Sequence, residues 1–214
     1  MLFIFTINDF EMAKQLPIYE ATIENVDDGL YTVSFVDCPA VLSDFLYFKE
    51  DKKPLNFRVE NEEKRLVTGV LMRADYPIYR IGNSGYEYYI RFSRQTIEKM
   101  VEKWLSEGLT NNVNLMHNPE NYVENVHLRE IFIKDSERGI TPKGYEDIEE
   151  GSLFGTYYVE NDEVWQSIKN GEFKGFSIEC LMSSKEVEME DDKQLLSDIL
   201  DLMKKIENKR KNRK

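Results

Sequence analysis

Cysteine and histidine are both scarce in this chain of 214 residues, which contains two of each. Cys38 and Cys180 are too few for the disulfide framework of a small secreted domain, so we expect free thiols in a reducing compartment. His117 and His127 lie ten residues apart, and the chain has neither an HxxxH nor a CxxC spacing. The sequence therefore gives no support for a zinc site, and no metal or other cofactor is expected.

Long apolar runs and the common nucleotide and hydrolase motifs are also absent. No segment has the roughly 18 apolar residues of a transmembrane helix, and the opening MLFIFTINDF lacks the basic start of a secretory signal. GNSG (residues 82–85) and GEFKG (residues 171–175) lack the lysine-serine pair and the helix context of phosphate loops. The GxSxG elbow is missing, and none of the 40 acidic residues forms a pair that stands out as a glycosidase dyad. We expect a cytoplasmic protein that is neither secreted nor bound to a membrane.

Positive charge is scarce except at one end. The formal net charge is −12, yet residues 204–214 contain seven basic residues and one acidic residue. An acidic body disfavours nonspecific binding to nucleic acid or to anionic membranes, whereas the basic end suits an acidic partner. A nucleic-acid contact by this end remains a third, weaker interpretation of the function.

Material for a folded core is plentiful, with 41% apolar and 12% aromatic residues. We predict one compact domain over residues 1–182. Alternating patterns predict strands, and the first two, around Asp27, Asp28 and Gly29, are expected to form a hairpin. The predicted strands cover residues 19–26, 30–37, 56–60, 65–72, 86–92, 111–116, 126–135, 153–160 and 173–182.

Helical spacing predicts two helices inside this domain and one beyond it. One begins at Ser93 and ends at Gly108, and a shorter one over residues 162–172 is capped by Asp162. Residues 136–151 are predicted to form an exposed loop. An acidic linker is predicted at 183–192 and an amphipathic helix with a basic end at 193–214, which docks on a partner, self-associates or packs on its own domain.

Ser177 is the candidate nucleophile because a hydroxyl stands between Phe176 and Ile178 in an otherwise apolar strand, GEFKGFSIEC. Taken alone, a serine there is more often a small polar filler. A serine needs a neighbouring base, and His117, which ends a strand just before a loop, is the better placed histidine. Cys180 is a rival nucleophile, but residues three apart on a regular strand face opposite ways.

Five segments in the same order resemble the phage serine protease family of the XkdF type, a branch of the procapsid maturation proteases. They are VDCPAV (residues 36–41), VTGVLMRADYPIYR (residues 67–80), the helix from Ser93, NNVNLMH (residues 111–117) and VWQSIKNGEFKGFSIE (residues 164–179). The resemblance implies a serine endopeptidase related to the herpesvirus assemblins, with His117 as the base and Ser177 as the nucleophile. Cys180 stands where the family tends to have a glycine shortly after the serine.

The fold that this resemblance implies is α+β and mainly β: a bent sheet or closed β-barrel surrounded by helices, as in assemblins, plus the C-terminal amphipathic helix. Our choice for the third catalytic member is Glu130, on a strand expected beside that of His117. His127 is its rival because assemblins use a second histidine, although a structural role is the simpler interpretation for it. Only one of these two can serve, since they face opposite ways. Gly175 is expected to let substrate backbone approach.

The implied function is cleavage of scaffold protein, of capsid protein and of the enzyme itself during procapsid maturation. The implied partners are the major capsid protein, the scaffold protein and a portal protein, together with self-association. The implied location is the host cytoplasm, inside the assembling procapsid. The alternative is a noncatalytic capsid- or scaffold-associated protein that keeps the protease fold.

Overall fold

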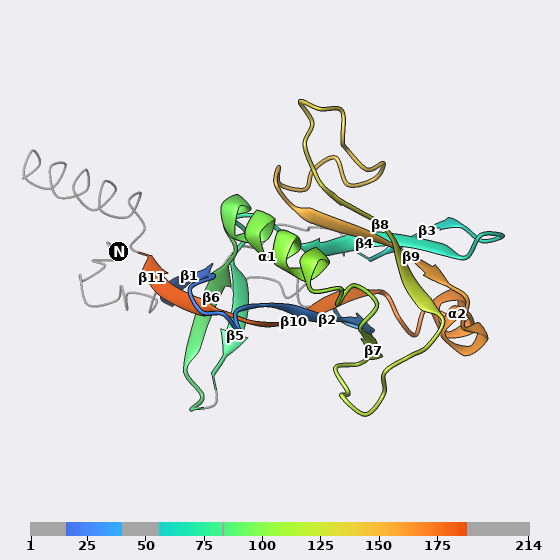
Figure 1. The fold of residues 1–214 in the computed structure, drawn as a ribbon, viewed down its shortest axis with the longest axis horizontal. Helices are drawn as coiled ribbons and strands as arrows, with labels where there is room; N and C mark the ends of the chain where they lie inside the picture. Colours follow the sequence, from blue (N-terminus) through green and yellow to red (C-terminus); the bar gives the residue numbers. More distant parts are fainter. Residues whose placement is uncertain (1–15, 40–55, 83, 188–214) are drawn as a thin grey trace, which may run out of the picture.

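The structure, a computed structural model, describes residues 16–39, 56–82 and 84–187. These residues form helices α1 (Arg94–Ser106) and α2 (Asp162–Lys169) and three β-sheets (Figure 1). The first sheet has the order β11 (Ser183–Val187), β1 (Ile18–Thr22), β6 (Glu87–Arg91) and β5 (Ile78–Ile81). The second has the order β10 (Gly175–Leu181), β2 (Gly29–Val36) and β7 (Val113–Leu115). The third has the order β3 (Arg58–Asn61), β4 (Leu66–Met72), β9 (Leu153–Val159) and β8 (Val126–Ile133).

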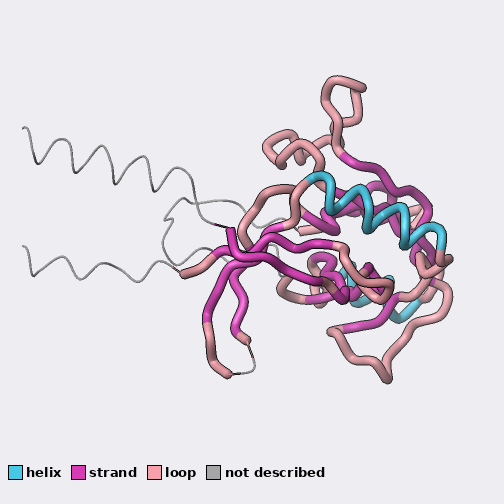
Figure 2. The backbone as a smooth tube through the Cα atoms, turned by 60° about the vertical axis from the view of Figure 1, so that its left-hand side comes forward, coloured by secondary structure: helices cyan, strands magenta, loops and turns pink. Residues whose placement is uncertain are grey.

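Strands β10 and β11 connect two of these sheets. Only Met182 separates them, and Figure 1 shows one continuous path that leaves the second sheet and enters the first. Figure 2 shows the strands and the two helices from another side. β10 pairs antiparallel with β2, and β11 pairs antiparallel with β1. The segment that carries Ser177 therefore continues from the second sheet into the first.

The predicted α+β fold, a bent sheet or closed barrel surrounded by helices as in assemblins, is wrong, because the regular structure of the described residues is mostly β-strand. In the described residues the sheets are open, and the two short helices do not enclose them. The predicted hairpin is wrong as well, because β1 pairs with β11 and β6 while β2 pairs with β10 and β7. The Asp28 carboxylate accepts hydrogen bonds from the backbone amides of Glu24 and Asn25, and this turn directs the chain into another sheet. Local patterns predict strands, but pairing between distant segments decides how the strands are arranged in sheets.

Helix α1 confirms its predicted limits. The Ser93 hydroxyl accepts from the Thr96 amide at 3.3 Å, and Gly108 has φ +70°, which suits a residue without a side chain after a helix. Asn161, not Asp162, caps α2, because its side chain accepts from the amides of Glu163 and Val164. The predicted loop at 136–151 is largely turns and bends.

An aromatic cluster joins the second sheet to the third. Phe176 of β10 lies with its ring centroid 5.0 Å from Phe35, 5.3 Å from Phe57 and 5.1 Å from Tyr157. Gly69 of β4 makes room for it, since a Cβ atom there would lie 2.9 Å from Phe57 and 3.1 Å from Phe176. Close packing of these rings fixes the position of β10.

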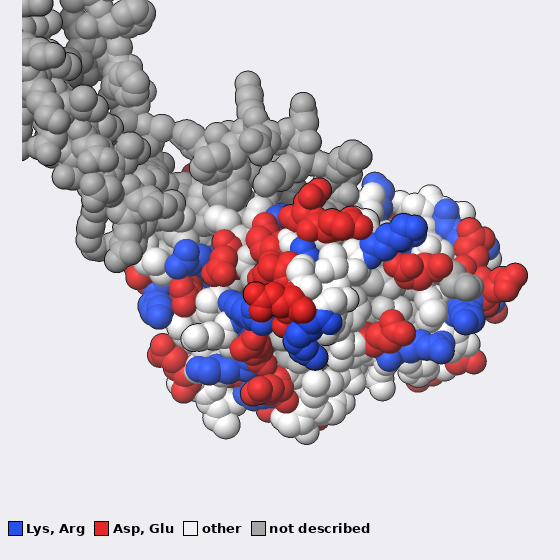
Figure 3. Space-filling model, turned by 90° about the horizontal axis from the view of Figure 1, so that it is seen from above, with Lys and Arg blue, Asp and Glu red and all other residues white. Residues whose placement is uncertain are grey.

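The remaining predictions concern the C-terminal segment, membrane-spanning helices and the charge of the surface. Residues Ser183–Val187, the start of the predicted linker, form β11, and the rest of the linker and the predicted C-terminal helix lie outside the described residues. No helix in the described ranges is long and apolar enough to cross a membrane. Figure 3 shows acidic and basic side chains interspersed over one face of the molecule.

Candidate functional site

Strand β10 places Ser177 directly opposite Ser34 of β2. Because side chains alternate along a strand, Ser177 and Glu179 share one face of the second sheet, and Phe176 and Ile178 share the other. The face with Ser177 is polar but well covered: Ser34 is fully buried, and Ser177 is 7% exposed.

His117 is brought to this face by a left-handed turn after β7. Met116 and His117 have φ values of +54° and +56°, a conformation that costs free energy for any residue with a side chain. Two hydrogen bonds to β2 hold the turn: the Met116 amide donates to the Phe35 carbonyl at 3.0 Å, and the His117 amide donates to Ser34 Oγ at 3.1 Å. Backbone strain of this kind, held by the surrounding structure, is typical of functional sites.

Glu179 is the carboxylate that contacts the imidazole. His117 Nδ1 lies 3.0 Å from Glu179 Oε1, and the same oxygen accepts from Asn114 Nδ2 at 2.8 Å. The Ser34 hydroxyl contacts Asn114 Oδ1 and lies 3.2 Å from Glu179 Oε1. A carboxylate only accepts hydrogen bonds, so Nδ1 carries a proton and Nε2 is left as the basic nitrogen.

Two opposing effects act on the Glu179 carboxyl. Burial on its own raises the pKa, but hydrogen bonds from Asn114, His117 and Ser34 outweigh it and leave the pKa of Glu179 below its ordinary value. The side chain is therefore a carboxylate at neutral pH. Ionised, it can orient the imidazole and stabilise a positive charge that forms on it.

The residues predicted from the sequence fall in two places. Ser177 and His117 both lie at the polar face of the second sheet, where the His117 imidazole contacts Glu179 and its backbone amide donates to Ser34 Oγ. Glu130 and His127 lie on β8 in the third sheet, where both are exposed and the His127 ring stacks on Tyr158. The expectation that the strand of Glu130 lies beside that of His117 is wrong, because β7 pairs with β2 and β8 with β9.

Glu179 is the residue that the sequence reasoning missed. The signal for it was present: it follows Ser177 by two positions in KGFSIE, and on a strand this spacing puts two side chains on one face. Asn114 was not predicted either: it lies on β7 beside Ser34 in the parallel pair, two residues before the turn at Met116. The prediction considered only residues close to His117 in sequence, and Glu179 lies 62 residues away.

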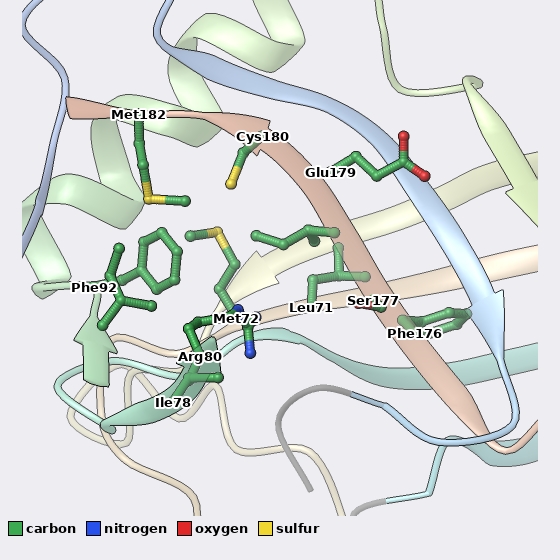
Figure 4. Close-up of a pocket in the computed structure, with 12 residues that line it drawn as sticks. Leu71, Met72, Ile78, Arg80, Phe92, Phe176, Ser177, Glu179, Cys180 and Met182 are labelled. Carbon is green, nitrogen blue, oxygen red and sulfur yellow. The ribbon is translucent and has the colours of Figure 1, made fainter. Parts of the chain in front are cut away.

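Cys180 faces a different environment. It is one of the residues around an apolar cavity of about 320 Å³, and Figure 4 shows Glu179 turned away from that cavity. Burial raises the pKa of the Cys180 thiol to about 12, and the nearby Arg80 only partly opposes this. The thiolate is the nucleophilic form, so the surroundings of Cys180 disfavour it as a nucleophile at neutral pH.

Gly175 serves packing within the chain. A Cβ atom at this position would overlap the ring of Pro39, which follows β2. The close approach that we expected from a substrate is thus made by the segment after β2. The described residues contain no group of three or more histidine, cysteine, aspartate or glutamate side chains able to hold a metal ion.

Comparison with known proteins gives one match. The family model described as "Putative phage serine protease XkdF" matches residues 55–186, a span that includes Asn114, His117, Ser177 and Glu179. No curated protein and no solved structure is significantly similar to the chain. This match covers more than half of the chain and four residues at the polar face of the second sheet.

Proposed function

Because the chain belongs to the phage serine protease family of the XkdF type, we propose that it is a serine endopeptidase with a Ser177–His117–Glu179 triad. The observation that carries this proposal is the 3.0 Å contact between Glu179 Oε1 and His117 Nδ1, on the sheet face that Ser177 shares. Glu179 replaces Glu130 as the proposed third member, since Glu130 lies in another sheet.

The proposed chemistry follows from these roles. The Ser177 hydroxyl attacks the carbonyl carbon of the scissile peptide bond while His117 Nε2 accepts its proton. Glu179 holds Nδ1–H and stabilises the imidazolium. The imidazolium then gives the proton to the leaving amine, which breaks the peptide bond and leaves an acyl ester on Ser177. Water, deprotonated by the same imidazole, hydrolyses the ester and restores the serine.

The direct bond between Ser177 and His117 is expected in the complex with substrate. Catalytic hydrogen bonds frequently tighten only when substrate is bound. In the structure the His117 imidazole contacts Glu179 and its backbone amide donates to Ser34, so the base is already oriented. Substrate binding then needs to align only the serine hydroxyl with Nε2.

The proposed biological role is procapsid maturation. The family is a phage family, and a protease within an assembling phage shell would act on the scaffold protein, the major capsid protein and itself. The host cytoplasm, inside the procapsid, is the proposed location, and a portal protein is a further proposed partner. The segment from residue 193 onward is proposed to recruit the enzyme to the shell.

Coexpression tests this role. The full chain is produced together with the scaffold and major capsid proteins encoded beside it, and products are analysed by electrophoresis and mass spectrometry. Truncated products are expected with the wild type and with Ser106→Ala, an exposed serine at the end of α1, and not with Ser177→Ala or His117→Ala. Identical products from the wild type and Ser177→Ala would falsify the protease assignment.

A noncatalytic capsid-associated protein is the second candidate. It is favoured by one observation, that Ser177 is nearly buried. It predicts that wild type and Ser177→Ala enter procapsids equally and that no protein in them is shortened. The same coexpression therefore separates the two functions.

A further inference from the structure

A closed ring of hydrogen bonds lies at the polar face of the second sheet. The His117 backbone amide donates to Ser34 Oγ at 3.1 Å, and the Ser34 hydroxyl donates to Asn114 Oδ1. Asn114 Nδ2 donates to Glu179 Oε1 at 2.8 Å, and this oxygen lies 3.0 Å from His117 Nδ1. The hydrogen-bond ring therefore begins at the backbone of His117 and ends at the imidazole of the same residue.

The direction of each bond in the hydrogen-bond ring follows from the groups that form it. Because Ser34 Oγ accepts from the His117 amide, its single proton is available for Asn114 Oδ1. Glu179 Oε1, the other acceptor near this hydroxyl, is farther away at 3.2 Å. The Asn114 amide turns its NH₂ group to Glu179, since a carboxylate can only accept. A flipped amide would place its oxygen against the carboxylate, so one orientation is favoured.

The hydrogen-bond ring has a buried half and an accessible half. Ser34 and Asn114 are both 0% exposed, so a polar atom of theirs that loses its partner has no water to replace it. The side chains of His117 and Glu179 are 44% and 34% exposed. A buried polar network in which every group has a partner specifies one arrangement of its side chains. The buried half can therefore hold the imidazole while the imidazole stays open to a substrate.

The same two buried side chains act on the strained turn that carries the imidazole. Met116 and His117 have left-handed φ values, and Ser34 accepts one of the two amide bonds that hold them. Asn114 lies on β7, two residues before the turn, and donates to Glu179. Ser34 thus fixes the backbone of the histidine, and Asn114 fixes the carboxylate that the imidazole contacts.

We propose that Ser34 and Asn114 are positioning residues that keep the proton of the neutral His117 imidazole on Nδ1. Nε2 then stays free to accept the proton of the nucleophile. The inference rests on the proposed protease function, in which His117 is the base. Because both side chains are fully buried, they touch no substrate and act only through His117 and Glu179.

Nitrogen NMR tests the position of the proton without catalysis. The nitrogen-15 resonances of an imidazole distinguish a protonated nitrogen from a bare one, and the chain has two histidines. At a pH where both imidazoles are neutral, His117 of the wild type should carry its proton on Nδ1. Ser34→Ala and Asn114→Leu should each move much of it to Nε2, the form that free histidine prefers. His127, on β8 in the third sheet, is the internal reference and should not change.

Peptide hydrolysis tests the consequence for the reaction. In both variants we expect kcat to fall roughly 10- to 100-fold with KM within about twofold, because a misplaced base slows the chemical step. The double variant Ser34→Ala/Asn114→Leu should lose no more than about threefold beyond the worse single variant, since either change already opens the hydrogen-bond ring.

Thr32→Val is the matched control. Thr32 lies two residues before Ser34 on the same face of β2 and is 2% exposed. Its hydroxyl lies 3.2 Å from Tyr122 OH, outside the hydrogen-bond ring. The variant removes a buried hydroxyl from the same sheet face, yet it should leave the proton of His117 on Nδ1 and kcat within about twofold of wild type.

The outcomes separate the two proposals. If both variants match Thr32→Val in the NMR spectra and in kcat, while cleavage still depends on Ser177, the positioning role is overturned and the protease function stands. A wild type with the proton of His117 on Nε2 overturns the positioning role as well. If the two variants lose the Nδ1 proton but no cleavage depends on Ser177, the protease function is overturned, and control of the proton by the hydrogen-bond ring is confirmed.

Discussion

The two faces of strand β10 differ in polarity: one carries polar side chains and the other apolar ones. On one face Ser177 lies beside Glu179, Ser34, Asn114 and His117, and hydrogen bonds join these last four residues. On the other, Phe176 packs against aromatic rings and Ile178 lines the apolar cavity. A hydrogen bond adds only about 1 kcal/mol net to stability, whereas a buried aromatic ring adds several times more. One face therefore holds the strand in place, and the other carries the side chains of the proposed triad.

Glu179→Gln should give the largest effect, and that effect should fall mainly on activity. Glutamine keeps an oxygen acceptor for Asn114 but loses the charge that stabilises the imidazolium. We expect kcat/KM for peptide cleavage to fall roughly 1,000- to 10,000-fold, as when the acid of a serine-protease triad becomes an amide. The measurement is peptide hydrolysis, with the free energy of unfolding followed in urea.

The matched control is Glu130→Gln, on β8 in the third sheet. It should leave kcat/KM within about twofold of wild type, as expected for an exposed side chain remote from the site. Loss of activity in Glu130→Gln with retention in Glu179→Gln would restore the original choice of third member.

Phe176→Ala should give the largest effect on stability. The ring is 1% exposed, and its loss leaves a cavity between the second and third sheets. We expect the free energy of unfolding to fall by about 3–5 kcal/mol. Ser177→Ala, the next residue along the strand, should change it by less than about 1 kcal/mol. Equal losses in the two variants, measured by urea unfolding, would contradict the division between the faces.

The sequence predicts the strands of this molecule better than it predicts their partners. The limits of α1 follow from Ser93 and Gly108 because helix caps are local. The failed hairpin of β1 and β2 and the absent barrel share one cause: pairing joins segments as distant as Ile18 and Val187, and no local signal encodes it.

The same distinction applies to the site. Sequence motifs predict Ser177 and His117, and the structure places both at the polar face of the second sheet. The prediction of Glu130 as third member required a strand pairing that the sequence does not give. Glu179 needed only the alternation of side chains along β10, so that part of the site was within reach of the sequence.

Gly175→Ala tests how firmly the start of β10 is fixed. The added methyl group would overlap Pro39, so either the segment after β2 or the strand has to shift. We expect a loss of about 1–3 kcal/mol in the free energy of unfolding, typical of overpacking. At Gly82 the nearest atom to an added Cβ is 3.6 Å away, and Gly82→Ala should cost less. Similar losses in both variants, measured by thermal unfolding, would argue against a tight fit at Gly175.

Cysteine alkylation gives the smallest effect and tests the apolar face without changing a residue. Burial raises the pKa of Cys180 to about 12, so at pH 8 only roughly one molecule in ten thousand carries the reactive thiolate. Iodoacetamide should modify the exposed Cys38 first, and labelling of Cys180, followed by mass spectrometry, should rise about tenfold with each pH unit while the protein stays folded.

Arg80→Met sharpens this test, because the charge of Arg80 lowers the pKa of Cys180 against the effect of burial. Without that charge the thiolate becomes scarcer, and labelling of Cys180 at pH 8 should slow further while that of Cys38 stays the same. Rapid labelling of Cys180 at pH 8 would show that the cavity is open to water, and the cysteine would then return as a candidate nucleophile. Slow labelling together with full peptide cleavage by Cys180→Ala would leave the chemistry to the polar face of β10.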